Sequence, residues 1–247
     1  QGAIDKGYLL RKPDGEAWIG QLWGGYHPPV GIVDLTNPAA VEWYKSLLRP
    51  HLEMGADVFK TDFGEGVPAD TVAYNGMTGV ELHNLYTLIY NDIVADLTAE
   101  LSSHHTGLVW GRCTYAGGQR HAAQWGGDPN CTFQGMASTL RGGLSMGACG
   151  HAFWSHDIAG FHRTPTPELY VRWAQFGLLS PLSRAHGMSS RLPWDYGEET
   201  TRIFRDYVRL RYRLLPYIYS YAAYAHETGL PMLRAMVLEF PDDLTCR

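Results

Sequence analysis

The chain has 247 residues, of which 45% are apolar and 18% are charged, and its formal net charge is −5. These proportions are ordinary for a soluble globular protein with a substantial core. The acidic balance and the absence of Lys/Arg runs argue against a surface for nucleic acid or anionic membranes. No apolar run reaches the roughly 18 residues that a membrane span needs.

Two features of the sequence bear on the cellular compartment, the N-terminus and the cysteines. The first residues lack the charged-then-apolar build of a signal peptide, and the absence of a starting Met suggests a processed product or a fragment. The cysteines show no CxxC pair and no zinc-type spacing; they are Cys113, Cys131, Cys149 and Cys246. We therefore expect reduced structural thiols and a cytoplasmic protein.

The first third of the chain predicts a loop, a strand and a helix. Residues 1–30 are rich in Gly, Pro and Trp and are expected to form a long ordered loop, followed by a strand at 31–35. Asn37 and Pro38 then mark a helix start, as cap and first helical residue. That helix is expected to run towards Met54, with Pro50 as a break or kink.

Alternating strands and helices are predicted for the rest of the chain. Apolar Val58 and Phe59 indicate a short buried strand that turns polar at Asp62. Leucines and isoleucines at spacings of three and four make the helix at 80–101 the clearest one. Further strands are expected at 108–112, up to Trp125, at 152–154 and, more weakly, at 179–184; further helices are expected at 134–146, 167–178 and 198–227, the last with a break at Pro216.

This alternation is typical of an α/β fold with a parallel sheet. No GxGxxG follows a strand and no GxxxxGK[ST] occurs, which disfavours the nucleotide-binding versions of the class. Six strands are predicted, whereas a (β/α)₈ barrel needs eight. Either two strands escape the pattern or the chain begins after the first two.

Polar side chains follow the predicted strands, where a barrel would gather them around one pocket. Each has a structural explanation when taken alone: Asp62, for example, would cap a loop or pair with Lys60, and His156 would be a satisfied loop histidine. Taken together, so many ionisable groups at strand ends favour a functional site. They are Asp34, Asp62, Glu65, Arg112, Asp128, His156, Asp157, Arg184 and His186.

Two carboxylates opposed across such a pocket can hydrolyse a glycoside without a cofactor. The nucleophile must stay ionised, and a cation such as Lys60 or Arg112 would lower its pKa. The proton donor needs a raised pKa, which a partly dry wall such as Trp125 would favour. A catalytic metal is disfavoured because no HExxH or paired-His spacing occurs.

At this point the chain resembles glycoside hydrolase family 31, and in particular its α-xylosidase branch. Seven segments carry the resemblance in chain order: Phe-Lys-Thr-Asp-Phe-Gly-Glu at 59–65, Trp-Gly-Gly-Asp at 125–128, Leu-Arg-Gly-Gly-Leu-Ser at 140–145, Phe-Trp-Ser-His-Asp-Ile at 153–158, Ser-Arg-Ala-His-Gly at 183–187, Arg-Ala-Met at 234–236 and Glu-Phe-Pro-Asp-Asp at 239–243. Together these segments span nearly the whole chain.

The resemblance implies a role for each matched residue. Asp62 looks like the nucleophile on the fourth barrel strand and Asp128 like the general acid/base, with a covalent glycosyl-aspartate that water releases with retention. The other matches are substrate-binding: Arg112, Trp125 and His186 at the sugar in the −1 subsite, and Trp23, Lys60, Phe63, Trp154 and Asp157 at the pocket wall.

The residues before the nucleophile indicate the substrate. Lys60 and Thr61 resemble the α-xylosidase branch, whereas typical α-glucosidases resemble Trp-x-Asp-x-Asn-Glu there. The implied activity is hydrolysis of terminal non-reducing α-D-xylosides of xyloglucan-type oligosaccharides, without a cofactor. An α-glucosidase or a transglycosylase of the same family, and a truncated barrel that only binds carbohydrate, are the alternatives. Full-length family members are often homo-oligomeric.

The family also has parts without a counterpart in the sequence. These are a β-sandwich before the barrel, β-domains after it, the first barrel strands and an aspartate on the first strand that binds the distal sugar hydroxyls. Residues 1–247 are therefore expected to form a partial (β/α)₈ catalytic domain, about strands 3–8, without the flanking β-domains.

Overall fold

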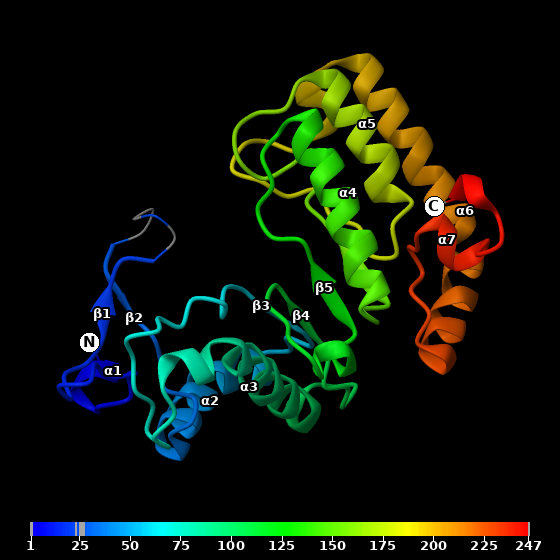
Figure 1. The fold of residues 1–247 in the computed structure, drawn as a ribbon. Helices are drawn as coiled ribbons and strands as arrows, with labels where there is room; N and C mark the ends of the chain where they lie inside the picture. The colour runs from blue at the N-terminus through cyan, green and yellow to red at the C-terminus, as the bar shows by residue number, and fades with distance from the viewer. Residues whose placement is uncertain (1, 23, 25–27, 247) are drawn as a thin grey trace. The chain divides into compact units, whose positions relative to one another are not determined.

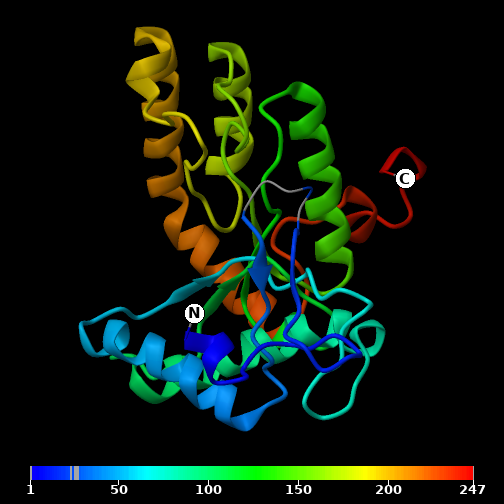
Figure 2. The same cartoon turned by 90° about the vertical axis from the view of Figure 1, so that its left-hand side faces the viewer.

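A computed structural model describes residues 2–22, 24 and 28–246. The chain divides into two compact units, Gln1–His121 and Ala122–Arg247, and each is described by itself. Figure 1 labels the helices and strands, and Figure 2 shows them turned by 90°.

The first unit is built around a β-α-β arrangement. Strand β3 pairs in parallel with β4, with Phe59 opposite Val109 and Thr61 opposite Gly111, and α3 connects the two strands. The elements of this unit are α1 (Gly2–Asp5), β1 (Ile19–Gly20), β2 (Val30–Gly31), α2 (Pro38–Glu53), β3 (Phe59–Thr61), α3 (Gly79–Leu101), β4 (Val109–Gly111) and the 3₁₀ turn η2 (Gly118–Arg120).

Helix starts in this unit follow from local chemistry. The Asn37 side chain accepts a hydrogen bond from the Ala39 N–H (3.0 Å), and Pro38 opens α2, as predicted. A reciprocal capping box opens α3, in which the Glu81 N–H donates to the Thr78 hydroxyl and the Thr78 N–H donates to the Glu81 carboxylate. These two caps fix where the helices covering the strands begin.

Helices α2 and α3 pack against each other and lie alongside one another in both views, and α3 also packs on β3 and β4 (Figures 1 and 2). One core cluster centres on Val94 and Val109, between α3 and β4. A second cluster includes Leu10, Leu82 and Tyr86 and joins α3 to the N-terminal segment. Strand β3, which directly precedes Asp62, is thus covered by α3, and α3 in turn packs on α2.

The second unit repeats the β-α-β arrangement. Strand β5 pairs in parallel with β6, with Trp125 opposite Ser155, and α4 connects them. The core of this unit lies where α5 packs on α6, around Ile158, Tyr170 and Ala174. Its elements are β5 (Ala123–Trp125), α4 (Phe133–Ala148), β6 (Phe153–Ser155), α5 (Pro167–Leu178), η3 (Pro193–Tyr196), α6 (Glu198–Thr228), α7 (Met236–Glu239) and η4 (Leu244–Cys246).

The parallel α/β organisation predicted from the sequence is confirmed, as are four strands and five long helices. The prediction of a plain loop over residues 1–30 is wrong, because α1 and β1 lie there and β2 begins at Val30. All four cysteines are free thiols. Within the described residues, no helix combines the length and the apolar character needed to cross a bilayer.

The predicted strand at 31–35 is wrong in its partners. The segment is extended, but it pairs antiparallel: β2 with β1, and Val33 with Leu9, while the Leu10 N–H donates to the Ile32 carbonyl (2.9 Å). The apolar run signalled an extended backbone, whereas the choice of partner depends on the N-terminal segment that folds back onto it.

The weak strand predicted at 179–184 is also wrong. The Arg211 guanidinium binds the carbonyls of Leu178 (2.9 Å), Ser180 (2.6 Å) and Pro181 (2.9 Å), so these acceptors are not available to a neighbouring strand. Pro181 has no N–H to donate. Only Arg184 forms an isolated parallel bridge, with Asp157.

The predicted helix breaks at Pro50 and Pro216 do not occur, and α2 and α6 continue through them. A proline inside a helix removes the hydrogen bond to the carbonyl four residues earlier and costs about 3 kcal/mol. For Pro216 that carbonyl belongs to Tyr212, on an exposed part of α6.

Candidate active site

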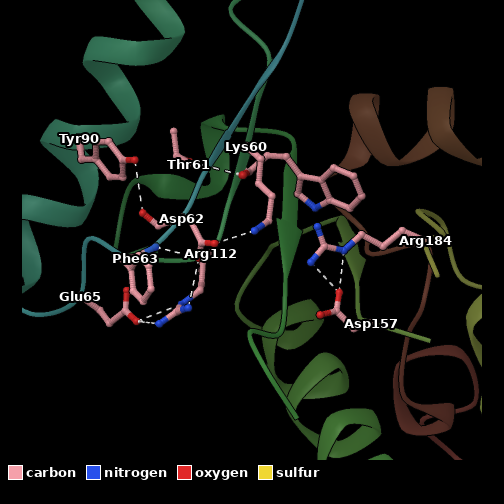
Figure 3. Close-up of polar contacts among 10 residues, drawn as sticks. Lys60, Thr61, Asp62, Phe63, Glu65, Tyr90, Arg112, Asp157 and Arg184 are labelled. Atoms are coloured by element: carbon pink, nitrogen blue, oxygen red, sulfur yellow. Dashed lines mark hydrogen bonds and ion pairs between the residues drawn. The ribbon is translucent and has the colours of Figure 1, made fainter. Parts of the chain in front are cut away.

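Asp62 lies in the loop that directly follows β3, and the strand alternation decides which side chains accompany it. Along β3, Thr61 is buried in the core and Lys60 is exposed, so these two side chains lie on opposite faces of the strand. The Asp62 carboxylate contacts Lys60 through Nζ to Oδ2 at 2.7 Å and Arg112 through Nη1 to Oδ1 at 3.1 Å (Figure 3).

The charge state of Asp62 follows from these contacts. Partial burial acts to raise its pKa, but the Lys60 hydrogen bond and charge, the Phe63 N–H and the Arg112 charge together outweigh burial. The pKa of Asp62 is therefore lowered from its ordinary value, and the carboxylate stays ionised in weak acid. This confirms the expectation that cations beside Asp62 would lower its pKa. Asp62 also makes the two contacts expected of a purely structural residue, because it pairs with Lys60 and accepts a hydrogen bond from the Phe63 N–H in its loop.

Arg112 is held in place by a second carboxylate and an aromatic ring. Its Nε donates to Glu65 Oε1 at 3.0 Å, and its Nη2 also contacts that oxygen. Its guanidinium carbon lies 4.3 Å from the centre of the Phe63 ring. Since its two ends bind Glu65 and Asp62, Arg112 presents a fixed positive charge to Asp62 (Figure 3).

The loop after Asp62 has a constrained backbone. Phe63 has a φ of 59° and Gly64 a φ of 96°. A Cβ on Gly64 would lie 2.6 Å from Cys113 Sγ and 2.9 Å from a Tyr90 ring carbon, so only glycine fits there. Positive φ is uncommon in a non-glycine residue, and among the described residues Phe63 shares it with His105, Ala159 and Arg163.

The ends of β3 and β4 are joined by a buried asparagine that the sequence analysis missed. The Thr61 hydroxyl donates to Asn91 Oδ1 (2.6 Å), and Asn91 Nδ2 donates to the Cys113 carbonyl (2.9 Å). From the same helix, the Tyr90 hydroxyl donates to the Asp62 carbonyl (3.3 Å). Helix α3 thus sets the spacing between the loop after β3, which carries Asp62, and the loop after β4, which carries Arg112.

A largely apolar cavity of about 460 Å³ opens beside Asp62. Its walls include Leu35, Val67, Tyr86 and Tyr90, and Asp62 is its one carboxylate among the described residues. Apolar walls around a single ionised group are a common arrangement in small-molecule sites.

In the second unit, Asp128 follows β5 after two glycines. Gly127 has a φ of 71°, and a Cβ on Gly126 would lie 2.9 Å from the Trp154 ring. A Cβ on Gly143 of α4 would meet the same ring, which explains why glycines occupy both positions. Asp128 and Trp154 line a cavity of about 560 Å³, with polar groups of α4 such as Ser138 on its wall.

A buried ion pair lies at the end of β6 in the same unit. Arg184 Nε donates to Asp157 Oδ1 at 2.6 Å, and Arg184 Nη2 lies 2.6 Å from that oxygen (Figure 3). The guanidinium carbon lies 5.2 Å from the centre of the Trp125 ring, and both Trp125 and Asp157 are buried. His186 is exposed, with its ring 5.5 Å from that of Phe161.

The structure assigns structural contacts to two of the polar residues that follow the predicted strands. Asp34 accepts hydrogen bonds from Thr36 and from the Tyr74 N–H (2.6 Å), so it braces a loop. His156 is buried, accepts a hydrogen bond from Trp173 Nε1 (2.8 Å) and contacts Ser180, and burial lowers its pKa to about 3. It is a neutral histidine packed in the core, stacked on Phe176.

Trp23 lies outside the described residues. Among the residues that the structure describes, no group of three or more His, Cys, Asp or Glu side chains is arranged to hold a metal ion. The structure therefore gathers Lys60, Phe63 and Arg112 around Asp62, places Arg184 against both Asp157 and the Trp125 ring, and places Asp128 with Trp154.

Comparison with known proteins identifies the fold family. Residues 1–221 match the TIM-barrel domain of glycosyl hydrolases family 31. The chain belongs to this family. It is 44% identical to an alpha-xylosidase of Emericella nidulans over 241 residues, 97% of the chain and 30% of that protein. It is also 44% identical to the alpha-xylosidase XylQ of Lactiplantibacillus pentosus over 258 residues, 98% of the chain and 32% of that protein.

A solved family 31 relative adds a chemical observation. The cycloalternan-degrading enzyme of Trueperella pyogenes, in complex with a covalent intermediate, superposes with a TM-score of 0.85 at 28% identity, over 99% of the chain and 35% of the enzyme. The chain thus spans about a third of the length of its relatives. The α/β architecture is that of a family 31 TIM-barrel domain.

Proposed function

We propose that the protein to which this family 31 domain belongs hydrolyses terminal non-reducing α-D-xylosides with retention of configuration. The observation that carries the proposal is the Asp62 carboxylate, kept ionised by Lys60 and Arg112 beside a cavity. Similarity to two alpha-xylosidases supports the substrate, and the covalent intermediate of a relative supports the mechanism.

In the first step Asp62 Oδ attacks the anomeric carbon, and the bond from that carbon to the leaving oxygen breaks. Asp128 gives its proton to the leaving oxygen, which departs as an alcohol. A xylosyl-aspartate ester remains on Asp62. In the second step the Asp128 carboxylate takes a proton from water, the water oxygen attacks the anomeric carbon, and Asp62 leaves as a carboxylate.

The charges around Asp62 suit this sequence. Lys60 and Arg112 stabilise the carboxylate before attack and again as it leaves in the second step. Glu65 keeps Arg112 aligned through its own contacts with the guanidinium. The positive φ of Phe63 is a form of backbone strain that is often found at functional sites.

The test is hydrolysis of p-nitrophenyl α-xyloside and α-glucoside by the full-length protein. The proposal expects a higher kcat/KM on the xyloside and loss of turnover in both Asp62→Ala and Asp128→Ala. A preference for the glucoside would make the protein an α-glucosidase, and dominant transfer to added sugars would make it a transglycosylase. Sugar binding without turnover in the wild-type protein would refute an enzymatic function.

A further inference from the structure

A buried arginine beneath the Asp128 loop has no place in the mechanism described above. Arg191 is 6% exposed, and its hydrogen bonds go to carbonyl, hydroxyl and sulfur atoms within the described residues. Nε and Nη2 donate to the Gly160 carbonyl at 3.1 Å and 2.6 Å, and Nη1 donates to the carbonyls of Ser189 and Ser190 at 3.0 Å each.

The same guanidinium reaches the segment that carries Asp128. Nη2 lies 3.3 Å from Cys131 Sγ, three residues after Asp128, and 3.2 Å from the Phe161 carbonyl. Arg191 therefore joins three segments: residues 126–132, which we call the Asp128 loop, residues 157–163, and residues 186–191. The last segment carries His186.

Backbone contacts connect these segments directly. The Phe161 N–H donates to the Pro129 carbonyl (2.7 Å), and the Cys131 N–H donates to the His162 carbonyl (3.2 Å). Gly160 has a φ of 81°, and a Cβ on it would lie 2.9 Å from Cys131 Cα and 3.0 Å from the Asn130 carbonyl. The Asp128 loop therefore rests on the backbone of residues 157–163 without an intervening side chain.

The main chain of Arg191 is itself anchored to a helix. Its carbonyl accepts a hydrogen bond from the Tyr170 hydroxyl of α5 at 2.5 Å, and the Tyr170 ring stacks on Tyr196 at 4.6 Å. Because α5 belongs to the core of the second unit, Arg191 is held at its main chain as well as at its guanidinium.

The chemistry explains why an arginine occupies this position. Burying a charge without a carboxylate is costly unless its donors are hydrogen-bonded. The planar guanidinium offers five N–H donors in fixed directions, whereas a lysine ammonium offers three on a flexible stem. An arrangement of carbonyls drawn from separate segments therefore needs the arginine fork to keep its geometry.

We propose that Arg191 is a positioning residue for Asp128, which sets the direction of the acid/base carboxylate through the segments it joins. This inference rests on the proposed function, in which Asp128 protonates the leaving oxygen. A displacement of about 1 Å in a reacting group can cost on the order of 100-fold in rate. Loosening the Asp128 loop should therefore weaken proton donation more than it weakens attack by Asp62.

The experiment compares Arg191→Lys with wild type in the full-length protein, on aryl α-xylosides whose leaving groups span a range of pKa. For good leaving groups kcat/KM should fall by less than about threefold, since these need little protonation. For poor leaving groups it should fall by about 10- to 100-fold. Such a change in slope is not expected from a general loss of folded protein.

Arg211→Lys is the matched control. Arg211 is another partly buried arginine of the second unit that donates to carbonyls, those of Leu178, Ser180 and Pro181. This variant should lower Tm while keeping the wild-type dependence on leaving group. An equal change of slope in Arg211→Lys would overturn the assignment of a specific role to Arg191.

Gly160→Ala provides a second test if Arg191→Lys does not fold. The added methyl would meet Cys131 Cα and the Asn130 carbonyl and so push residues 157–163 away from the Asp128 loop, while the Arg191 side chain is chemically unchanged. Its rates should show the same selective loss on poor leaving groups. A uniform loss across all leaving groups would contradict the inference.

The outcomes also separate the inference from the proposed function. Failure of wild-type protein to release any aglycone would refute the function. A steep leaving-group dependence in Asp128→Ala, together with a wild-type slope in a folded Arg191→Lys or Gly160→Ala, would refute only the role of Arg191.

Discussion

Arg112 and Arg191 use the same side chain in opposite ways, each in one of the two units. Arg112 contacts two carboxylates, those of Asp62 and Glu65, and lies over the Phe63 ring. Arg191 donates to backbone carbonyls, among them those of Gly160, Ser189 and Ser190, and contacts a cysteine sulfur. The first arginine acts on the charge of its neighbour, whereas the second acts on the position of a loop.

This difference matches what each proposed catalytic carboxylate needs. A nucleophile must be ionised before attack, so a lowered pKa is useful and a cation supplies it. A proton donor must point at the leaving oxygen, and a cation in contact with it would favour the wrong protonation state. An arginine bound to neutral carbonyls provides rigidity with less influence on that state.

The largest expected effect is loss of the Asp62 carboxylate. Asp62→Ala should reduce kcat/KM by more than about 10⁴-fold on good and poor leaving groups alike, because no covalent intermediate can form. Steady-state hydrolysis of aryl α-xylosides measures it. Substantial activity in this variant would show that the charged region of the first unit is structural.

A smaller and more selective effect is expected at Asp128. Asp128→Ala should lose roughly 10²- to 10⁴-fold on poor leaving groups and far less on good ones. The same substrate series measures both. Equal losses on the two kinds of substrate would show that Asp128 is not the proton donor.

Removing Lys60 should change the pH dependence. Lys60→Met removes the hydrogen bond and the charge that lower the pKa of Asp62, while burial continues to raise it. Asp62 would then become protonated at higher pH, so the acidic limb of kcat/KM should move upward by on the order of one pH unit.

The matched comparison for Lys60→Met is Lys45→Met, which removes an exposed pairing with Glu42 on α2. A pH profile measured for both variants and the wild type separates a local effect on Asp62 from a general effect of charge. An acidic limb that stays in place in Lys60→Met would contradict the assignment of Asp62 as the titrating nucleophile.

The smallest expected effect on turnover is at Asn91, where stability should change instead. Asn91→Leu leaves the Cys113 carbonyl without its buried donor and the Thr61 hydroxyl without its acceptor, at a cost of roughly 1–3 kcal/mol. Thermal unfolding measures the loss. Thr98→Val is the control, because its hydroxyl donates to the Val94 carbonyl within the same helix (2.7 Å) and so does not link α3 to a strand within the described residues.

Equal stability losses in Asn91→Leu and Thr98→Val would indicate that the link between β3 and β4 contributes nothing specific. A larger loss in Asn91→Leu, with kcat/KM lowered by less than about tenfold, is the result expected of a structural brace.

Local chemistry was sufficient to predict the helices. Asn37 with Pro38 and a periodic apolar run located α2 and α3 within a residue or two. Leu82 and Leu97 of the predicted apolar stripe are fully buried, whereas Leu85 and Ile89 are only partly buried. The polar Asn91, which the apolar pattern passes over, is buried because it bonds Thr61 and the Cys113 carbonyl.

Strand partners were beyond the reach of the sequence pattern. An extended segment at 31–35 was predicted correctly as extended, but its antiparallel partners lie more than ten residues earlier in the chain. At 179–181 the Arg211 side chain takes the place of a neighbouring strand. Its guanidinium binds backbone carbonyls there, and no local sequence pattern predicts such a contact.

The charged residues of the site were predicted from the sequence, but the residues that hold them in place were missed. Lys60, Asp62 and Arg112 were recognised because ionisable groups at strand ends stand out. Asn91 and Arg191 were not, since one lies within an ordinary helix and the other in a polar loop. Their roles depend on three-dimensional contacts with segments 22 to 60 residues away.

The most direct test of the account is to trap the intermediate. The full-length protein is incubated with a fluorinated α-xylosyl fluoride, which slows release of the sugar, and the peptides are then mapped by mass spectrometry. We predict one xylosyl adduct, on the peptide and at the carboxylate of Asp62, absent from Asp62→Ala. An adduct at another residue, or turnover of an ordinary xyloside to the inverted anomer without any adduct, would contradict the account.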